Sequence, residues 1–243
     1  MSEPAPRYHF NVAEIPTPGR VALHRLRLPR YVPEDVEVFR LDFDLVNPAP
    51  SADWAVLGDD ERERAAKFHR HDDRVRAIAT RAALRRLLGE RLHREPGALR
   101  FDAGPHGKPL LREGAALEFN VSHSGGFALI ALSRTGAVGV DIERRDRAID
   151  VTSLASLVLS PDEQAAGEGG VDAFFERWVV KEAILKALGL GVAEQLQALS
   201  VWRPGAAEEY ELRHAEEDWS GVGAWALDAP PGYAAALAFA KRG

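Results

Sequence analysis

The stretch that decides the fold is LEFNVSHSGGFALIALSRTGAVGVDIE, residues 117–143. Its alternation of apolar and polar residues, interrupted by glycines, predicts three strands. We expect these strands at Leu117–His123, Phe127–Ser133 and Val138–Glu143. The turn Ser124-Gly-Gly126 joins the first two strands as a hairpin, and a second turn at Thr135-Gly136 precedes the third.

Two carboxylates lie on the last of these strands. Residues two apart on a strand face the same side of its sheet, so Asp141 and Glu143 share one face. Val140 and Ile142 then face the core. Two carboxylates at a strand end can hold a hard cation through their oxygens. The simpler alternative is a solvent-facing strand that carries ordinary acidic residues.

The rest of the chain alternates between strands and helices. Upstream, residues 36–45 alternate as a strand does, and residues 59–93 have the spacing of one or two helices. Downstream, Ser160-Pro-Asp-Glu163 is a capping box that begins a helix, and Asp172–Leu188 is a helix closed by Gly189. Four short strands complete the pattern at about residues 198–203, 208–214, 223–228 and 233–240.

Strands and helices occur in both halves of the chain, with the changeover near Gly136. Residues 1–30 contain many prolines and predict an irregular N-terminal segment. We therefore expect an α+β fold with two similar halves, residues 31–135 and residues 136–243.

The expected helix over residues 172–188 presents charged residues one turn apart. Glu182 and Lys186 share a face of this helix, and Trp178 lies one turn before them on the same face. A surface ion pair beside a buried tryptophan gives the same pattern and contributes only about 0.3–0.5 kcal/mol. Catalysis and surface stabilisation therefore both stay open for this pair.

Polar residues also end the first strand of the opening stretch. Ser122 and His123 stand before a glycine turn, where they could meet a phosphate, or they simply belong to a polar hairpin. A Ser–His–acid hydrolase is disfavoured, because its nucleophile elbow needs Gly-x-Ser-x-Gly and neither Ser122 nor Ser124 follows such a glycine. In the expected loop at 104–109, proline and glycine hold Lys108 either toward an anion or at the surface.

Composition excludes several classes of protein. The chain has 243 residues and no cysteine, which rules out disulfide scaffolds, thiolate zinc sites and thiol nucleophiles and fits a cytoplasmic location. Its apolar runs are far shorter than the ~20 residues that span a bilayer. The formal net charge is −6, although residues 61–94 hold eleven Lys and Arg against five Asp and Glu. A local basic stretch on an acidic chain favours a small anion over a long nucleic acid.

Four motifs follow one another in a specific order. They are Gly-Lys-Pro at 107–109, Phe-Asn-Val-Ser-His-Ser at 119–124, Val-Gly-Val-Asp-Ile-Glu at 138–143 and Trp-Val-Val-Lys-Glu-Ala-Ile-Leu-Lys at 178–186. In this order they resemble the Sfp-type 4'-phosphopantetheinyl transferases. The resemblance extends from about Val36 to Phe239, and Phe68, Asp73 and Arg76 are similar to the upstream segment of that family.

The resemblance implies an enzyme that moves the phosphopantetheine arm of coenzyme A to a serine of an apo acyl or peptidyl carrier protein, releasing adenosine 3',5'-bisphosphate. Such carriers serve fatty acid, polyketide or nonribosomal peptide synthesis. It also implies Mg²⁺ on Asp141, Glu143 and Glu182, although the ligand types do not separate Mg²⁺ from Mn²⁺. Glu182 is then the catalytic base, directly or through a water, and Lys186 stabilises the phosphate. The coenzyme A contacts implied by the resemblance are Arg64, Arg76, Lys108, Ser122, His123 and Lys186.

The implied fold is a pseudo-dimer of two α/β halves in one chain, hence a cytoplasmic monomer that binds neither nucleic acid nor membrane. Three alternatives come from other classes. They are a non-catalytic coenzyme A sensor of the same fold, a metal-dependent phosphodiesterase that removes the arm, and a nucleic-acid-binding protein that uses residues 61–94. The full set of acids together with Lys186 favours the transferase over the sensor, whereas consumption of holo-carrier would mark the phosphodiesterase.

Overall fold

The computed structural model describes residues 14–15, 22–104, 108–112, 117–145, 150–167, 169–191, 195–205 and 207–241. Two antiparallel sheets form its centre, with strand orders β1-β2-β3-β7-β6 and β11-β12-β8. The first comprises β1 (Glu14–Ile15), β2 (Ala22–Arg25), β3 (Glu37–Asp42), β6 (Glu118–Ser124) and β7 (Phe127–Ser133). The second comprises β8 (Gly136–Arg144), β11 (Val222–Ala226) and β12 (Tyr233–Lys241).

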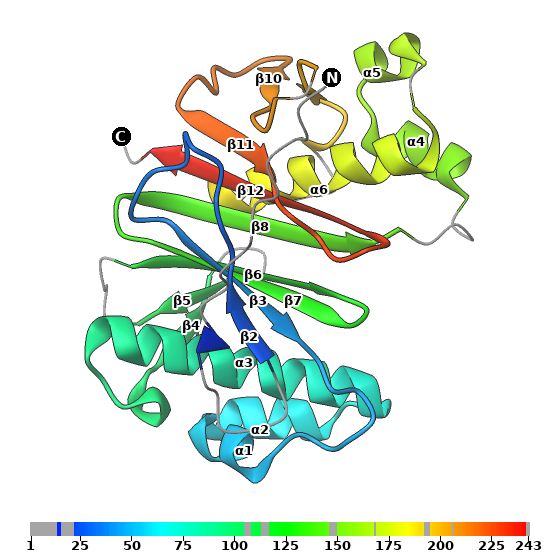
Figure 1. Ribbon diagram of the computed structural model, residues 1–243. Helices are drawn as coiled ribbons and strands as arrows, with labels where there is room; N and C mark the ends of the chain where they lie inside the picture. The colour runs from blue at the N-terminus through cyan, green and yellow to red at the C-terminus, as the bar shows by residue number, and fades with distance from the viewer. Residues whose placement is uncertain are drawn as a thin grey trace, which may run out of the picture.

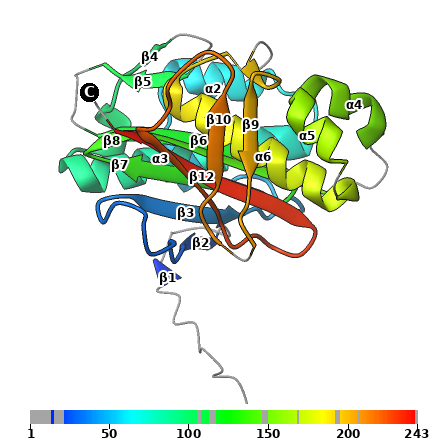
Figure 2. The ribbon, with the colours of Figure 1, turned by 90° about the horizontal axis from the view of Figure 1, so that it is seen from above.

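Each sheet carries one long helix. Helix α3 (His71–Leu92) lies against the first sheet, and α6 (Gly170–Leu188) lies against the second (Figure 1). The shorter elements are α1 (Ser51–Val56), α2 (Asp59–Ala66), α4 (Val151–Val158), α5 (Pro161–Ala166), the 3-10 turn η1 (Pro96–Ala98) and two ribbons, β4 (Phe101–Ala103) with β5 (Pro109–Leu111) and β9 (Leu199–Trp202) with β10 (Glu211–His214). Seen from above, β1 and β2 lie on one side of the molecule, away from α2 and α6 (Figure 2). Every helix in the described ranges is too short or too polar to cross a bilayer.

Large apolar side chains separate α3 from the first sheet. Leu84 and Leu88 of α3 are buried against Phe39 and Ile130. A second apolar layer lies between the two sheets, where residues such as Leu129 meet the inward face of the other sheet. The prediction that Val140 and Ile142 face the core is confirmed, because both belong to this layer and both are fully buried.

Helix α6 packs much closer to its sheet than α3 does. Strand β12 turns alanines toward the helix at positions 234, 236, 238 and 240. On β8, Gly139 lies under the helix, and a Cβ there would collide with the backbone of Ala183 and Ala187. Because alanine and glycine leave so little between helix and sheet, the side chains of α6 that point past the sheet edge reach β8 directly.

The structure confirms several local predictions. Strands β6, β7 and β8 lie where the opening stretch predicts them. In the capping box, the Glu163 amide donates to Ser160 Oγ and the Ser160 amide donates to the Glu163 carboxylate. Helix α6 ends at Gly189, whose φ of 71° is in the left-handed region that favours glycine.

The expectation of an irregular segment over residues 1–30 was wrong for part of its length. Strand β2 pairs with β3, and β1 pairs with β2, which extends the first sheet by two strands. These short strands are held by pairing to a distant strand, which local sequence periodicity does not report. Residues 1–13 and 16–21 lie outside the described residues, as do residues 105–107 of the expected loop at 104–109.

Candidate active site

The two sheets meet where β6 runs beside β8 (Figure 1), yet these strands share no backbone ladder. Side chains of β6 take the place of the ladder. The amides of Val140, Ile142 and Arg144 donate to Asn120 Oδ1, Ser122 Oγ and Ser124 Oγ at 3.0, 3.4 and 3.1 Å. We call Asn120, Ser122 and Ser124 the seam. Their spacing of two residues puts all three on one face of β6, and it satisfies every second amide of β8.

The seam also holds the two carboxylates of β8. Ser122 Oγ donates to Asp141 Oδ1 at 2.7 Å, and Ser124 Oγ donates to Glu143 Oε2 at 2.8 Å. Each of these serines therefore fixes one strand position through its backbone and one carboxylate through its side chain. The family resemblance assigns Ser122 to coenzyme A, but in this structure its hydroxyl donates a hydrogen bond to Asp141.

Helix α6 adds an acid and a base to this cluster. Lys186 Nζ lies 2.5 Å from Asp141 Oδ1 and 3.9 Å from Glu182 Oε2. Trp178 Nε1 donates to Glu182 Oε1 at 3.3 Å, which orients that carboxylate. The predicted face of Trp178, Glu182 and Lys186 is thus the face that meets β8, so these residues do not form a mere surface ion pair.

The cluster contains three carboxyl groups, those of Asp141, Glu143 and Glu182, and a single ammonium, that of Lys186. Burial, and after it the neighbouring Asp141 charge, raise the pKa of Glu143 to about 7 against the opposing effects of the Ser124 hydrogen bond and Lys186. Burial also raises the pKa of Glu182, and Asp141 again adds to the effect. Within the described residues, the buried Asp141 Oδ2 has no hydrogen-bond partner. An unpaired buried carboxylate oxygen is costly, so a cation is expected to complete this site.

A divalent metal fits the chemistry of these donors. Oxygen ligands suit a hard cation, and Asp141, Glu143 and Glu182 supply them together with an unsatisfied oxygen. No three His, Asp or Glu side chains of the described ranges are already gathered tightly enough to hold an ion. The ammonium of Lys186 lies against Asp141 instead. The three acids therefore fit a metal by the type of their donor atoms and by the unpartnered Asp141 Oδ2.

Lys108, directly before β5 of the β4–β5 ribbon, contacts the end of α6. Its Nζ donates to the backbone carbonyl of Lys186 at 3.1 Å, within the last turn of α6. A cation there interacts favourably with the negative end of the helix dipole. Burial lowers the pKa of Lys108, with Glu118 opposing the shift. Lys108 thus lies close to Lys186, and its hydrogen bond is to the helix end.

His123 lies at the meeting point of two cavities. One, of about 470 Å³, is lined also by Arg76 and Glu143, and the other, of about 260 Å³, by Arg64 and Phe68. Removal of water by the surrounding protein lowers the pKa of His123, and the charges of Arg76 and Lys186 add to this, although part of the ring remains exposed. Arg64 is exposed and lies apart from the carboxylate cluster.

Arg76 has a structural contact that the sequence did not indicate. Its Nε donates to the carbonyl of Gly125 at 2.7 Å, and its Nη1 donates to Asp73 at 2.9 Å. These bonds tie the first turns of α3 to the β6–β7 turn. Gly125 needs to be glycine here because its φ is 54° and a Cβ would collide with the hydroxyl of Tyr233.

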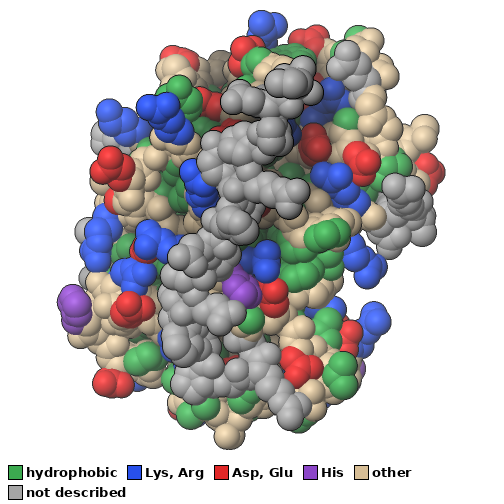
Figure 3. All heavy atoms as spheres, viewed as in Figure 1, with side chains coloured by type: hydrophobic (Ala, Val, Ile, Leu, Met, Phe, Trp, Pro, Cys, Tyr) green, Lys and Arg blue, Asp and Glu red, His purple; other side chains and the backbone are tan. Residues whose placement is uncertain are grey.

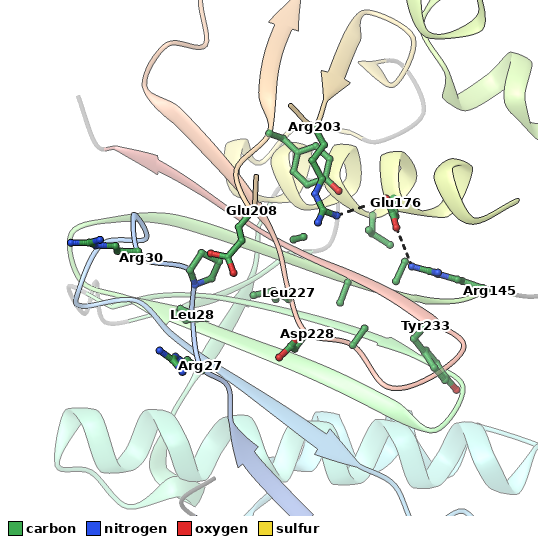
Figure 4. Close-up of a pocket in the computed structure, with 17 residues that line it drawn as sticks. Arg27, Leu28, Arg30, Arg145, Glu176, Arg203, Glu208, Leu227, Asp228 and Tyr233 are labelled. Carbon is green, nitrogen blue, oxygen red and sulfur yellow. Dashed lines mark hydrogen bonds and ion pairs between the residues drawn. The ribbon is translucent and has the colours of Figure 1, made fainter. Parts of the chain in front are cut away.

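A larger cavity, of about 700 Å³, contains none of the predicted site residues. Arg145 and Arg203 point toward Glu176 of α6 at its wall (Figure 4). Acidic and basic side chains therefore neutralise one another there. On the face shown in Figure 3, Lys and Arg side chains are likewise interspersed with Asp and Glu.

Asn120 and Ser124 hold the site strand β8 through hydrogen bonds, and the sequence reasoning did not assign them. The signal that could have found them is the period of two in Asn120, Ser122 and Ser124 beside apolar Phe119 and Val121. That alternation marks one polar face along the whole strand. The alternation does not show which other strand this polar face lies against.

Carboxylates that attract a cation, next to cavities lined by His and Arg that attract anions, are typical of proteins that bind phosphate esters. Comparison with known proteins agrees with this class. Residues 137–238 match the family model described as "4'-phosphopantetheinyl transferase superfamily", and residues 50–135 match "4'-phosphopantetheinyl transferase, N-terminal".

Named relatives give the same result. The 4'-phosphopantetheinyl transferase HetI of Nostoc is 36% identical over 169 residues, 66% of this chain and 71% of HetI. A putative 4'-phosphopantetheinyl transferase of Synechocystis is 38% identical over 146 residues, 57% of this chain and 59% of that protein. Sfp of Bacillus subtilis is 25% identical over 156 residues, 60% of this chain and 66% of Sfp. The chain belongs to the 4'-phosphopantetheinyl transferase superfamily, which confirms the resemblance seen in its motifs.

Proposed function

We propose that this chain transfers the 4'-phosphopantetheine arm of coenzyme A to a serine of an apo-carrier protein. The serine hydroxyl loses its proton, and its oxygen forms a bond to the phosphorus that bears the arm. The bond from that phosphorus to the bridging oxygen of the pyrophosphate breaks, and adenosine 3',5'-bisphosphate leaves with the electron pair. Membership of the superfamily and the names of the relatives support this assignment.

The observation that carries the proposal is the meeting of three elements at the seam. Strand β6 supplies Ser122, β8 supplies Asp141, and α6 supplies Lys186, whose Nζ lies 3.4 and 2.5 Å from the other two side chains. A transferase of a phosphate-linked group needs preorganised charges around the phosphorus more than a covalent nucleophile of its own. The described cluster has that character.

Glu182 takes the proton of the carrier serine, directly or through one water. In the metal-free cluster, burial and the Asp141 charge raise the pKa of Glu182, and when Glu182 binds the metal the proton passes through the water. Trp178 fixes one of its oxygens and leaves the other toward Lys186. Lys186 then stabilises the negative charge that develops on the leaving bisphosphate.

We also propose that Asp141, Glu143 and Glu182 hold a divalent cation, Mg²⁺ by family analogy and with Mn²⁺ satisfying the same ligands. When bound, this ion neutralises charge on the pyrophosphate. The residues of this chain have two separate tasks around it. Ser122 and Ser124 hold the β8 carboxylates in place, and Lys186 keeps an ammonium beside the phosphorus to be attacked.

The nucleotide end of coenzyme A binds beside His123, where the two smaller cavities meet. His123 and Arg76 face one cavity, and Arg64 faces the other, so each offers a donor to a phosphate. Lys108 adds an ammonium beside the last turn of α6 through its bond to the Lys186 carbonyl. This arrangement lets a long polyanion pass over the seam from His123 to Lys186.

The proposed architecture is a pseudo-dimer of residues 31–135 and residues 136–243. Two similar units, each a long helix on an antiparallel sheet, support it (Figure 1). Because β6 comes from the first half and β8 and α6 from the second, one chain supplies the whole cluster. We therefore expect a monomer that works on its carrier without a second copy.

The test is an intact-mass measurement of an apo-carrier protein incubated with the chain, coenzyme A and Mg²⁺. We expect the carrier to gain the mass of one phosphopantetheine arm. The Glu182→Gln variant and a sample with EDTA should show almost no gain. Glu176→Gln, on the same helix but at the wall of the 700 Å³ cavity, is the matched control and should react as the unmodified chain does.

Acyl, peptidyl and polyketide carriers are all assayed before a negative result is accepted. Unmodified carriers throughout, with coenzyme A bound to the chain, would contradict the transfer. Loss of the arm from holo-carrier would instead identify a phosphodiesterase.

A further inference from the structure

A buried charged pair lies next to the proposed catalytic base along the sequence of α6. Lys181, the residue before Glu182, is 0% exposed. Its Nζ donates to Glu163 Oε2 at 2.5 Å, to the Val158 carbonyl at 2.8 Å and to the Leu196 carbonyl at 3.0 Å. An ammonium has three N–H donors, so every one of them has an acceptor.

Glu163 is equally well satisfied. It is 1% exposed, and its Oε2 also accepts the Ser160 amide at 2.8 Å. Its Oε1 accepts the Val201 amide at 2.8 Å. The pair therefore joins α6 to the end of α4, to the start of α5, to the segment before β9 and to β9 itself. We call the Lys181–Glu163 pair the tether.

A contribution to the stability of the fold does not explain why the tether is charged. Taking two charges out of water is costly, and apolar residues of similar volume are often as stable or more so in such positions. Apolar side chains, however, tolerate sliding and rotation of a helix over its neighbours. An ammonium with three directed hydrogen bonds tolerates neither, so the tether fixes geometry where an apolar contact would not.

Rotation of α6 matters because Lys181 and Glu182 are adjacent and point about 100° apart around the helix. A turn of the helix by ~20° would move a side-chain tip ~5–6 Å from the axis by about 2 Å. Displacements on the order of 1 Å at a reacting group cost about 100-fold in rate. Gly139 sets how closely α6 approaches β8, but a glycine contact does not by itself set the rotation of the helix.

We infer that Lys181 and Glu163 are positioning residues that set the rotation of α6, and thereby the distance from Glu182 to Asp141. This inference rests on the proposed function, because it assigns the tether to the same site. It predicts that removing both charges leaves a folded protein with a misplaced base. Neither residue touches the substrate in this account.

The test compares the double variant Lys181→Met/Glu163→Gln with the unmodified chain. The double variant is chosen because Lys181→Met alone leaves a buried unpaired carboxylate and can fail to fold. Ile184→Val, which removes a methyl from the same buried cluster, is the control for a general loss of packing. Thermal unfolding, kcat and KM for coenzyme A are measured for all three proteins, well below their unfolding temperatures.

We expect kcat of the double variant to fall by about 10–100-fold, as for a misplaced catalytic group. Its KM for coenzyme A should stay within about twofold of the unmodified value, because the tether does not line the cavities at His123. Ile184→Val should keep its kcat. A folded double variant whose kcat stays within about twofold would overturn the inference.

A crystal structure of the double variant separates this inference from the proposed function. We expect the Glu182 carboxylate to move relative to Asp141 by more than about 1 Å, the scale at which rate is affected. An unmoved carboxylate would overturn the inference even if the unmodified chain transfers the arm. If the unmodified chain transfers nothing, the proposed function fails, and the displacement of Glu182 still decides whether the tether positions it.

Discussion

Helices α3 and α6 each lie along a sheet, but they are packed in opposite ways. Helix α3 is held off its sheet by leucines and a phenylalanine, such as Leu84 against Phe39. Helix α6 lies on alanines of β12 and on Gly139 of β8, nearly backbone to backbone. Of these two helices, α6 is the one whose lysine, Lys186, contacts a carboxylate of β8, and Glu182 lies beside that lysine. In the proposed function, the closely packed helix is thus the one that holds reacting groups at fixed distances from its sheet, and the helix held off by large side chains is a scaffold.

The largest effect on catalysis is expected from a substitution that forces α6 away from β8. Gly139→Ala places a Cβ into the backbone of Ala183, so the helix must shift. We expect kcat for arm transfer to fall by about 100-fold or more, because shifts on the order of 1 Å have that effect. Steady-state kinetics with an apo-carrier measures it.

Gly97→Ala is the matched control for this substitution. Gly97 has no atom within 4 Å of the added Cβ and no positive φ. Its activity should equal that of the unmodified chain. A Gly139→Ala protein that is folded and fully active would show that the close approach is not needed for catalysis.

The converse experiment removes a large side chain from the apolar layer between α3 and its sheet. Leu88→Ala removes a fully buried side chain that lines neither cavity beside His123 and should lower the free energy of unfolding by about 2–5 kcal/mol. Because α3 does not carry the reacting groups in this account, kcat of the folded fraction should stay within about threefold. Urea unfolding and kinetics at low temperature measure the two effects. A loss of kcat as large as that of Gly139→Ala would erase the distinction between the helices.

A smaller effect is expected at the seam. Asn120→Ala removes the acceptor of the Val140 amide, and an unsatisfied buried amide costs about 1–3 kcal/mol. We expect a similar loss in stability and a decrease in kcat of about tenfold, since β8 is then less well fixed, a smaller misplacement than the ~1 Å that costs 100-fold. Asn47→Ala, at a partly exposed turn, is the control and should change neither. Unchanged kcat in Asn120→Ala would limit the seam to a structural role.

The smallest effect concerns pH and the attachment of α3. A hydrogen bond from Arg91 of α3 is the main cause that keeps the pKa of Glu37 below its usual range. The contribution of this pair to stability is therefore complete above the unfolded pKa of about 4.3 and is lost as the pH falls through the lower folded pKa. Urea unfolding of Glu37→Gln between pH 7 and pH 3 should show a smaller loss of stability than the unmodified chain shows. Parallel pH curves for the two proteins would contradict this assignment.

Local sequence patterns predicted the elements that carry the chemistry. The alternation in β6, β7 and β8 and the capping box at Ser160 are signals within a few residues, and both are confirmed. The shared face of Glu182 and Lys186 follows from helix geometry alone, and α6 does turn this face toward Asp141. Asp141 and Glu143 likewise follow from strand geometry.

The parts that sequence did not predict depend on contacts between distant segments. Strand β2 exists because β3 pairs with it, and the prolines around it gave the opposite expectation. The seam needs β6 to lie beside β8, which no local period reports. The tether was not predicted either, because Lys181 lies about 100° from Glu182 around the helix and could join either face by its spacing. Only the packed structure shows that it is buried against Glu163.

The most direct test of the central claim is a crystal structure of the chain with coenzyme A and Mg²⁺ bound. We predict that the pyrophosphate lies at the seam, with Lys186 within hydrogen-bond distance of a phosphate oxygen and the metal on Asp141, Glu143 and Glu182. The 3'-phosphate should lie beside His123. A pyrophosphate bound elsewhere, for example in the 700 Å³ cavity beside Arg145 and Arg203, would contradict the account.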